Sequence, residues 1–228
     1  MATPELHLET AFVFDGEHRI TSTREPNPSL SVRFVLARGA GSVAWAVRTD
    51  VNAAVASELD QFAASEPVLA GGNWEAPPVH AERYEELLAS DFAEVDAGPL
   101  FEFPADLVAP DGIVAVTAER DLATHFHGWI VGEIKNGRTP VMAIVEDNAP
   151  VSICFCARRS NTAAEAGVDT AESFRKRGYA ARVTAAWALA LRARKMTPLY
   201  STSWTNAASL GVARKLGLIT YGSVWTMT

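Results

Sequence analysis

The sequence predicts a mixed α/β fold, and three observations lead to this prediction. Segments with the pattern of short strands and segments with the 3.6-residue period of helices succeed one another along the chain. Hydrophobic residues make up 48% of the 228 residues and charged residues 21%, which is enough apolar material for a packed core. No low-complexity tract argues for disorder. A chain of this length is expected to form one large domain or two small ones.

Two hairpins are expected within the first 50 residues. Residues 12–14 and 19–22 have the composition of strands and flank Asp15-Gly16, a strong hairpin turn signal. Residues 31–39 and 42–49 have the same strand pattern and are joined by a turn that contains two glycines. The chain therefore begins with strands.

Helices are expected next. Residues 51–65 have helical spacing that puts Val51, Val55, Leu59 and Phe62 on one face, and a shorter helix is expected at about residues 80–89. A proline- and glycine-rich segment follows, with three prolines and two glycines in residues 96–112. We interpret it as a boundary between an N-terminal α/β region, residues 1–110, and a second region, residues 111–228.

The second region has a more regular alternation of elements. One or two helices are expected in residues 118–134, a long alanine-rich helix in residues 180–194 and another in residues 206–216, ended by Gly217. The strands that separate or precede these helices are expected at residues 113–117, 140–145, 151–156, 164–170, 199–203 and 219–225.

Charge is distributed unevenly between the two regions. Residues 1–110 contain 18 acidic and 6 basic residues, a net charge of −12, whereas residues 111–228 contain 9 acidic and 14 basic residues, a net charge of +5. Seven of these bases lie between residues 171 and 195, together with one acid, Glu172. This pattern predicts a local anion site on an acidic protein. It lacks the broad basic face of a nucleic-acid-binding protein, so no nucleic-acid partner is expected.

The sequence also bears on location and on metal binding. No stretch approaches the roughly 18 apolar residues of a membrane span, and the first residues lack the features of a signal peptide, so a cytoplasmic protein without a membrane partner is expected. Cys154 and Cys156, two apart on one strand, are poor disulfide partners and are expected to be reduced. Together with His125 and His127 they would make a zinc site of unusual spacing, so we predict no metal.

The sequence RKRGYA, residues 175–180, is the strongest functional signal. It lies between a predicted strand and the long helix, and the first turn of a helix offers unpaired backbone N–H groups and the positive end of the helix dipole. Gly178 lets a ligand approach the backbone, while Arg175, Lys176 and Arg177 add positive charge. The alternative is an ordinary strand-to-helix turn with a solvated basic face.

The order of motifs around this turn resembles the GNAT superfamily of N-acetyltransferases. The resemblance rests on Arg175, Gly178 and Ala180 in the R/Q-x-x-G-x-G/A pattern, then on Asn206, then on Lys215-Leu216-Gly217 at the end of the next helix. It covers roughly residues 111–228. The resemblance implies a mixed, mostly antiparallel central sheet flanked by helices, and acetyl-CoA as the co-substrate.

The resemblance also implies which residues hold acetyl-CoA. In this family the strand before the turn separates from its neighbour and its backbone pairs with the pantetheine arm, the turn binds the pyrophosphate, and an Asn contacts the arm. The Asn position also suits a helix N-cap, and both roles are compatible. The corresponding residues are Val168, Asp169, Thr170, Arg175, Lys176, Arg177, Gly178, Tyr179, Ala180, Ala181 and Asn206.

The catalytic positions depart from the family pattern. Many relatives have a Tyr seven residues after the Asn as general acid, where this chain has Ala213, and some have a Glu five residues before it, where this chain has Ser201. We expect Glu165, on the separating strand, to be the base. Four other residues, on strands that flank the expected cleft, are candidates to donate a proton or order a water: Tyr200, Ser201, Ser203 and Tyr221.

These observations predict an N-acetyltransferase that moves an acetyl group directly to a primary amine of a small molecule or peptide. If residues 1–110 border the acceptor site, their charge of −12 favours a cationic acceptor. A non-catalytic acyl-CoA-binding or sensor module is the first alternative, because the usual acid and base are absent, and a structural domain without a CoA site is the second. A homodimer is left open.

Overall fold

The computed structural model describes residues 1–89 and 94–228, which form five α-helices and eleven strands. The helices are α1 (Pro4–Ala11), α2 (Ala53–Ala64), α3 (Ala81–Leu88), α4 (Tyr179–Ala193) and α5 (Ala207–Leu216). The strands are β1 (Phe12–Phe14), β2 (Ile20–Thr23), β3 (Phe34–Gly39), β4 (Val43–Val47), β5 (Val95–Glu102), β6 (Val114–Val116), β7 (Val141–Glu146), β8 (Ala149–Arg159), β9 (Ala163–Thr170), β10 (Thr197–Ser201) and β11 (Ile219–Met227).

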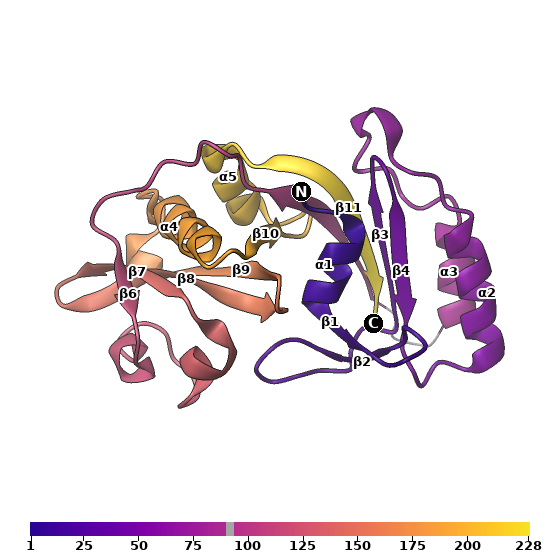
Figure 1. Cartoon of the computed structure of the whole chain (residues 1–228), viewed down its shortest axis with the longest axis horizontal. Helices are drawn as coiled ribbons and strands as arrows, with labels where there is room; N and C mark the ends of the chain where they lie inside the picture. The colour runs from indigo at the N-terminus through magenta and orange to yellow at the C-terminus, as the bar shows by residue number, and fades with distance from the viewer. Residues whose placement is uncertain (90–93) are drawn as a thin grey trace.

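Nine of these strands form one continuous sheet in the order β4-β3-β11-β5-β10-β9-β8-β7-β6, and β1 and β2 form a separate hairpin. Every pair of neighbours in the nine-stranded sheet is antiparallel except β9 and β10, which are parallel. Figure 1 shows the sheet turning from the β6–β9 end to the β3–β4 end of the molecule. The predicted mixed, mostly antiparallel sheet flanked by helices is therefore confirmed.

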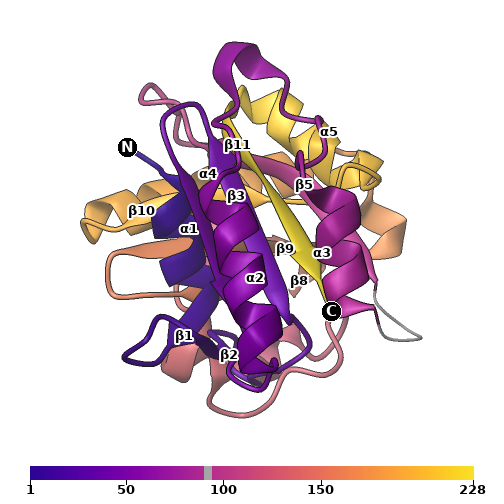
Figure 2. The same ribbon diagram turned by 90° about the vertical axis from the view of Figure 1, so that its right-hand side faces the viewer.

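Two parts of the sheet carry helices from opposite ends of the chain. The helices α2 and α3 lie side by side (Figure 2), with α2 against β4 and the Tyr84 ring of α3 against Phe34 of β3. Leu59 of α2 and Tyr84 of α3 are fully buried there with Trp225 of β11. The predicted apolar face of α2 is confirmed, because Val51 and Leu59 are buried in this cluster and Val55 and Phe62 pack against it, with Ala56 and Ala63 as further buried members. Small side chains let the helix lie close to the sheet.

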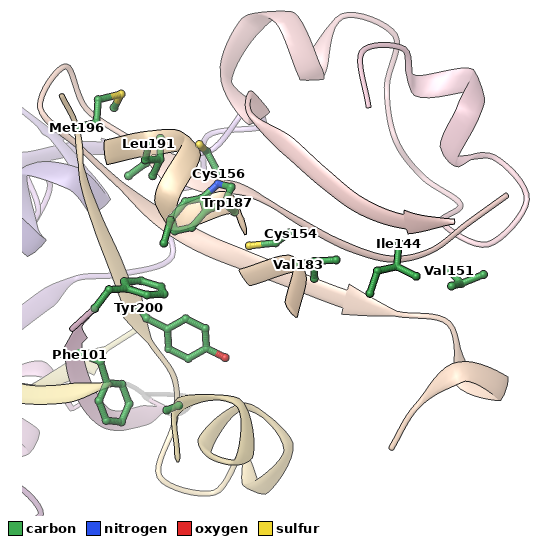
Figure 3. Close-up of a cluster of buried hydrophobic side chains, with 14 residues drawn as sticks. Phe101, Ile144, Val151, Cys154, Cys156, Val183, Trp187, Leu191, Met196 and Tyr200 are labelled. Carbon is green, nitrogen blue, oxygen red and sulfur yellow. The ribbon is translucent and has the colours of Figure 1, made fainter. Parts of the chain in front are cut away.

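The other end of the sheet is covered by α4, whose alanine-rich face packs on β7, β8, β9 and β10. Trp187 of α4 is fully buried and lies next to Cys156, and Cys154 lies nearby in the same core (Figure 3). Both cysteines are free and buried, as expected for two thiols on one face of a strand. Burial raises the pKa of Cys156 to about 11, so its thiol stays protonated at neutral pH.

The helix α1 is an element that the sequence analysis missed. Its start has a recognisable signal, because the Thr3 hydroxyl accepts the N–H of Leu6 at 3.2 Å and Pro4 occupies the first helical turn. The helix packs on β3 and β4 and also reaches β8 and β9. An N-terminal element therefore contacts the strands on which the predicted site lies.

The expected helices in residues 118–134 are wrong. That segment contains a 3₁₀ turn, Glu119–Leu122, and runs into a π-helical turn, Ile134–Arg138. The Glu119 carboxylate accepts the N–H groups of Gly132 at 3.0 Å and Ile134 at 2.9 Å, which folds the segment back on itself. Gly128 and Gly132 have φ values of 100° and 96°, which a regular helix excludes.

The first half of the segment interpreted as a boundary, residues 96–112, lies in β5, a strand in the interior of the sheet. One edge of β5 pairs with β10 and the other with β11, so the sheet passes through this segment. The structure places strands of both predicted regions in one sheet, and the division into residues 1–110 and 111–228 stays a prediction. Within the described residues, no helix is both long and apolar enough to cross a membrane.

Candidate functional site

The parallel strands β9 and β10 pair over three residues and then separate. Pairing runs from Thr197 and Ala163 to Leu199 and Glu165. Beyond that point β9 stays on β8 as far as Thr170, while β10 stays on β5 as far as Ser201. The two strands therefore diverge, and a wedge opens between them.

A pocket of about 690 Å³ occupies this wedge and the start of α4. Its walls come from the second half of β9, the turn before α4, the first residues of α4, the end of β10 and one side of α5. The lining residues are Ala166, Val168, Asp169, Thr170, Phe174, Arg175, Lys176, Gly178, Tyr179, Ala180, Ala181, Tyr200, Ser201, Asn206, Ala208, Ser209, Gly211, Val212 and Lys215.

The turn before α4 has the backbone geometry of an anion-binding loop. Gly178 is the N-cap of α4, has φ 80° and provides no side-chain cap, so the first N–H groups of the helix are left for a ligand. Lys176 also has a positive φ, 64°, which is uncommon for a residue with a side chain. The positive φ favours glycine at this position, and the end of the Lys215 side chain lies close by, since a Cβ on Gly178 would be 2.3 Å from Nζ of Lys215.

The basic residues near this turn have different partners. Arg175, Lys176 and Lys215 line the pocket. Arg177 does not, because its guanidinium lies 3.4 Å from the Glu146 carboxylate and stacks 4.9 Å from the centre of the Phe174 ring. The predicted cluster of seven bases is therefore divided, and only part of it faces the pocket.

Two further bases of α4 hold the chain rather than an anion. Arg182 donates to the carbonyl of Asp111 at 2.7 Å, and Arg192 donates to the carbonyls of Phe103 and Pro104 at 2.8 Å and 2.9 Å. These bonds fix the connection between β5 and β6 on the outer side of the helix. The excess of positive charge in residues 171–195 thus has a structural use as well.

Ten of the eleven residues predicted to hold the co-substrate line the pocket, and Arg177 is the exception. Asn206 is the N-cap of α5, and its side chain accepts the N–H of Ser209 at 3.0 Å, so it caps the helix from a position in the pocket wall. That these eleven residues contact a co-substrate stays a prediction.

Tyr200 is the predicted catalytic residue that lies deepest in the pocket wall. Its ring packs in the core under α4 (Figure 3), and its hydroxyl lies 2.6 Å from Oγ of Ser209 on α5. Burial raises the pKa of Tyr200 to about 12, in spite of the hydrogen bond with Ser209, which lowers it. The phenol therefore keeps its proton at neutral pH.

Glu165 lies at the point where the strands separate, behind Ser201. Ser201 lines the pocket, and its hydroxyl donates to the Glu165 carboxylate, which is itself 4% exposed. The other carboxylate oxygen lies 3.2 Å from Nη1 of Arg158 on β8. Burial would raise the pKa of Glu165, but Arg158, His7 and the Ser201 hydroxyl together outweigh it and lower that pKa below its ordinary value.

The other two catalytic candidates do not line the pocket. Tyr221 of β11 is on the Glu165 side, and its hydroxyl is buried without a hydrogen-bond partner. Burial raises the pKa of Tyr221, and the negative charges of Glu165 and Glu102 raise it further. Ser203 follows β10 and its hydroxyl lies 3.0 Å from that of Thr205, outside the pocket.

Several residues of the pocket were missed from the sequence. The sequence analysis named Lys215 as part of a motif and did not expect its charge to lie beside Gly178. The two residues come together only because α5 packs next to the turn before α4. Ser209 and Phe174 had no signal at all. His125, considered with the cysteines, contacts the Phe174 ring instead, with ring centres 5.7 Å apart. Among the described residues no group of three or more His, Cys, Asp or Glu side chains has an arrangement suited to a metal ion.

Comparison with protein families gives one match. The model of the GNAT acetyltransferase family matches residues 116–223, which include β9, the Gly178 turn, α4, β10 and α5. No curated protein is similar enough to be matched.

Solved structures are similar in fold at low sequence identity. An acetyltransferase from the GNAT family of Colwellia psychrerythraea is 14% identical and has a TM-score of 0.50, with 81% of this chain and 75% of that chain covered. A GNAT-family protein from Novosphingobium aromaticivorans is 21% identical over 59% of this chain, with a TM-score of 0.48, and this chain spans 64% of its length. A GCN5-related N-acetyltransferase-like protein from Streptococcus suis is 18% identical, with a TM-score of 0.44, and the match covers 86% and 84% of the two chains.

Proposed function

Residues 116–223 of this chain belong to the GNAT acetyltransferase family, a family that uses an acyl-CoA donor, and from this premise we propose that the protein is an N-acetyltransferase. The donor is acetyl-CoA, and the acceptor is a primary amine that attacks the thioester directly. The observation that carries this proposal is the single pocket that joins the separating strands β9 and β10 to the Gly178 turn.

The residues present fit the donor. The free N–H groups at the start of α4 suit a pyrophosphate, and Arg175, Lys176 and Lys215 supply positive charge around it. The backbone of β9 beyond Glu165 has no strand on its β10 side, so it can pair with the amides of the pantetheine arm. The bound donor supplies a thioester carbonyl carbon, which the amine attacks.

Ser201 and Glu165 form a route for the proton that the attacking amine must lose. Because the Ser201 hydroxyl already donates to Glu165, its oxygen can accept an N–H proton while its own proton passes to the carboxylate. The lowered pKa of Glu165 keeps the carboxylate ionised at neutral pH. This arrangement replaces the missing Glu at position 201.

Tyr200 is the residue in the pocket wall best suited to the departing thiolate. Its phenol is protonated at neutral pH because burial raises its pKa to about 12. A thiol with a pKa near that of Cys, about 8.5, leaves as a stable anion, so a hydrogen bond from Tyr200 is sufficient and full proton transfer is not needed. Many relatives have a general-acid Tyr at the position of Ala213, which in this chain is buried in the core and has no proton to donate. In this proposal Tyr200 takes the role of that Tyr.

The acceptor is proposed to be a cationic amine. The support is the charge of −12 on residues 1–110, part of which lies on the Glu165 side through α1 and Glu25. Acetylation of spermidine and of a lysine-ended peptide should exceed that of a neutral amine such as p-anisidine, measured as acetylated product by mass spectrometry. A preference for p-anisidine would remove this part of the proposal.

Donor binding is tested separately by calorimetry with acetyl-CoA. Gly178→Glu should abolish binding, because the new carboxylate repels the pyrophosphate and the φ of 80° at this position is strained for any residue with a Cβ. Gly217→Glu is a matched control, since Gly217 also has a positive φ, 62°, at a helix end but lies outside the pocket. Equal affinity in the two variants would contradict the donor site.

A non-catalytic acyl-CoA-binding module is the second candidate, favoured by Ala213 and Ser201 at the positions of the usual acid and base. It predicts acetyl-CoA binding that Gly178→Glu removes, with no acetylated product from any amine of the panel. Turnover therefore separates the two candidates, and binding does not.

A further inference from the structure

A chain of polar contacts runs from the N-terminal part of the molecule to the pocket. The Glu25 carboxylate lies 2.9 Å from Nε of Arg158, Nη1 of Arg158 lies 3.2 Å from the Glu165 carboxylate, and Glu165 accepts the hydroxyl of Ser201. Glu25 is outside the segment that matches the family, whereas the other three residues are inside it. This series of polar contacts thus links the two predicted regions at the proposed proton acceptor.

The segment that carries Glu25 is packed in place. A Cβ on Gly137 would come within 3.6 Å of the Pro26 ring, which puts residue 26 against the turn before β7. Nearby, α1 contacts both β8 and β9 and buries His7, which is 3% exposed, on the same side. Arg158 itself is about one-third exposed, so its guanidinium lies at the boundary between the buried carboxylate and solvent.

We infer that Arg158, held in place by Glu25, is a positioning residue that keeps the Glu165 carboxylate ionised and directed at Ser201. This inference rests on the proposed function, because it gives Glu165 the proton of the acceptor amine. It assigns a use to Glu25, which lies outside the family match: Glu25 holds the positive charge that faces the proton acceptor.

Arg158 has the largest effect among the groups that favour the ionised Glu165 carboxylate, and His7 and the Ser201 hydroxyl add to it. Burial of His7 in α1 lowers the pKa of its imidazole, although the nearby Glu165 carboxylate acts in the opposite direction. Tyr221 of β11 is kept neutral by burial and by the nearby carboxylates of Glu165 and Glu102, which raise its pKa. Among the described residues, no other cation forms an ion pair with Glu165. Without Arg158, the effect of burial would be opposed by His7 and the Ser201 hydroxyl alone, and the carboxylate would take up a proton at higher pH.

The test follows Glu165 itself and needs no acceptor. Protein labelled with ¹³C at the glutamate carboxyl carbons is titrated by NMR, and the Glu165 signal is identified by its loss in Glu165→Gln. In the native protein this signal should titrate below the ordinary pH range of a glutamate. In Arg158→Gln it should titrate at least about one pH unit higher, the lower end of the effect of a neighbouring arginine on a carboxylate.

Two controls keep the result specific. Arg159→Gln makes the same change at the next residue, whose guanidinium donates to the Thr139 carbonyl at 3.1 Å, and should leave the Glu165 titration unchanged. Arg158→Lys retains the charge, so its Glu165 signal should titrate close to the native pH. This variant also tests the inference if Arg158→Gln does not fold. In Glu25→Gln, Arg158 loses the carboxylate that holds it, so the Glu165 titration should move upward, by less than in Arg158→Gln.

The inference is overturned if Arg158→Gln and Arg159→Gln titrate alike, or if Glu25→Gln leaves the titration unchanged or moves it downward. When an acceptor is turned over, the acid limb of kcat/KM against pH should move by the same amount as the NMR titration in Arg158→Gln. A native protein with no turnover but the expected NMR shifts would remove the proposed reaction and leave the electrostatic arrangement standing. Turnover with an acid limb that does not move would overturn the role of Arg158.

Discussion

The backbone of Gly98 in β5 lies directly against the backbone of Thr202, just after β10. A Cβ on Gly98 would come 1.7 Å from the Thr202 carbonyl oxygen, and the next carbonyl on that side, that of Ala97, accepts the N–H of Trp204 at 3.0 Å. No space remains between the two backbones for a side chain at position 98. The chain that leaves β10 therefore crosses close over β5 before it enters α5 and the pocket wall.

Gly98→Ala should destabilise the protein by about 1–3 kcal/mol, the usual cost of overpacking, because backbone and not a flexible side chain must move. Denaturant unfolding measures this change. Gly41→Ala is the control, since Gly41 has open space around it and no positive φ, and it should change stability by less than about 0.5 kcal/mol. Equal effects of the two substitutions would contradict the close approach.

The contact at Gly98 also explains why the sequence analysis did not expect a strand there. Glycine and proline in residues 96–112 were interpreted as signs of a boundary, whereas in the structure Gly98 allows close packing within a strand. That requirement comes from Thr202, more than 100 residues away. No local pattern carries it.

Local signals were sufficient for most other elements. The Asp15-Gly16 turn predicted β1 and β2, and Gly217, with φ 62°, ends α5 as expected. The turn at Gly178 predicted the start of α4 and the place of the pocket. The partners of the charged residues were beyond prediction, because Arg177 meets Glu146 and Arg158 meets Glu25 only after distant segments fold together.

The position of β5 predicts that residues 111–228 do not fold alone. In the described structure β10 and β11 each pair with β5 and not with each other, so removal of residues 1–110 leaves two strands with unpaired edges. The fragment should be insoluble or lack a cooperative thermal transition, whereas the full chain shows one. Circular dichroism with thermal melting tests this. A folded, monomeric fragment would support a division of the chain at residue 111.

The buried ion pair of Arg38 and Glu66 predicts a large stability effect in the N-terminal part. The two side chains are 4% and 0% exposed, with Nη1 and Oε2 3.6 Å apart, and Glu66 also accepts the Tyr84 hydroxyl at 3.1 Å. Glu66→Ala leaves a buried arginine without its carboxylate and should cost about 3–5 kcal/mol of unfolding free energy.

The control for this substitution is Glu58→Ala. Glu58 also pairs with an arginine, Arg83, at 3.0 Å, but both side chains are nearly half exposed. Its removal should cost less than about 1 kcal/mol. Similar costs for the two variants, measured by urea unfolding, would show that the Arg38–Glu66 pair is not desolvated.

The last prediction concerns Tyr200 and the departing thiolate. Tyr200→Phe removes the hydroxyl and keeps the buried ring, so acetyl-CoA should bind with nearly unchanged affinity while kcat falls about 10- to 100-fold, the size of one lost hydrogen bond to developing charge. The pKa of about 12 means that the phenol stays protonated as pH rises, so loss of this proton produces no fall in kcat below about pH 11.

Ser209→Ala is the control, because it removes the partner of the Tyr200 hydroxyl and keeps the hydroxyl itself. Without its Ser209 Oγ partner at 2.6 Å, Tyr200 keeps its proton and its place, and kcat should change much less than in Tyr200→Phe. Equal losses in the two variants would mean that the Tyr200–Ser209 pair holds α5 in position and that Tyr200 does not act on the thiolate.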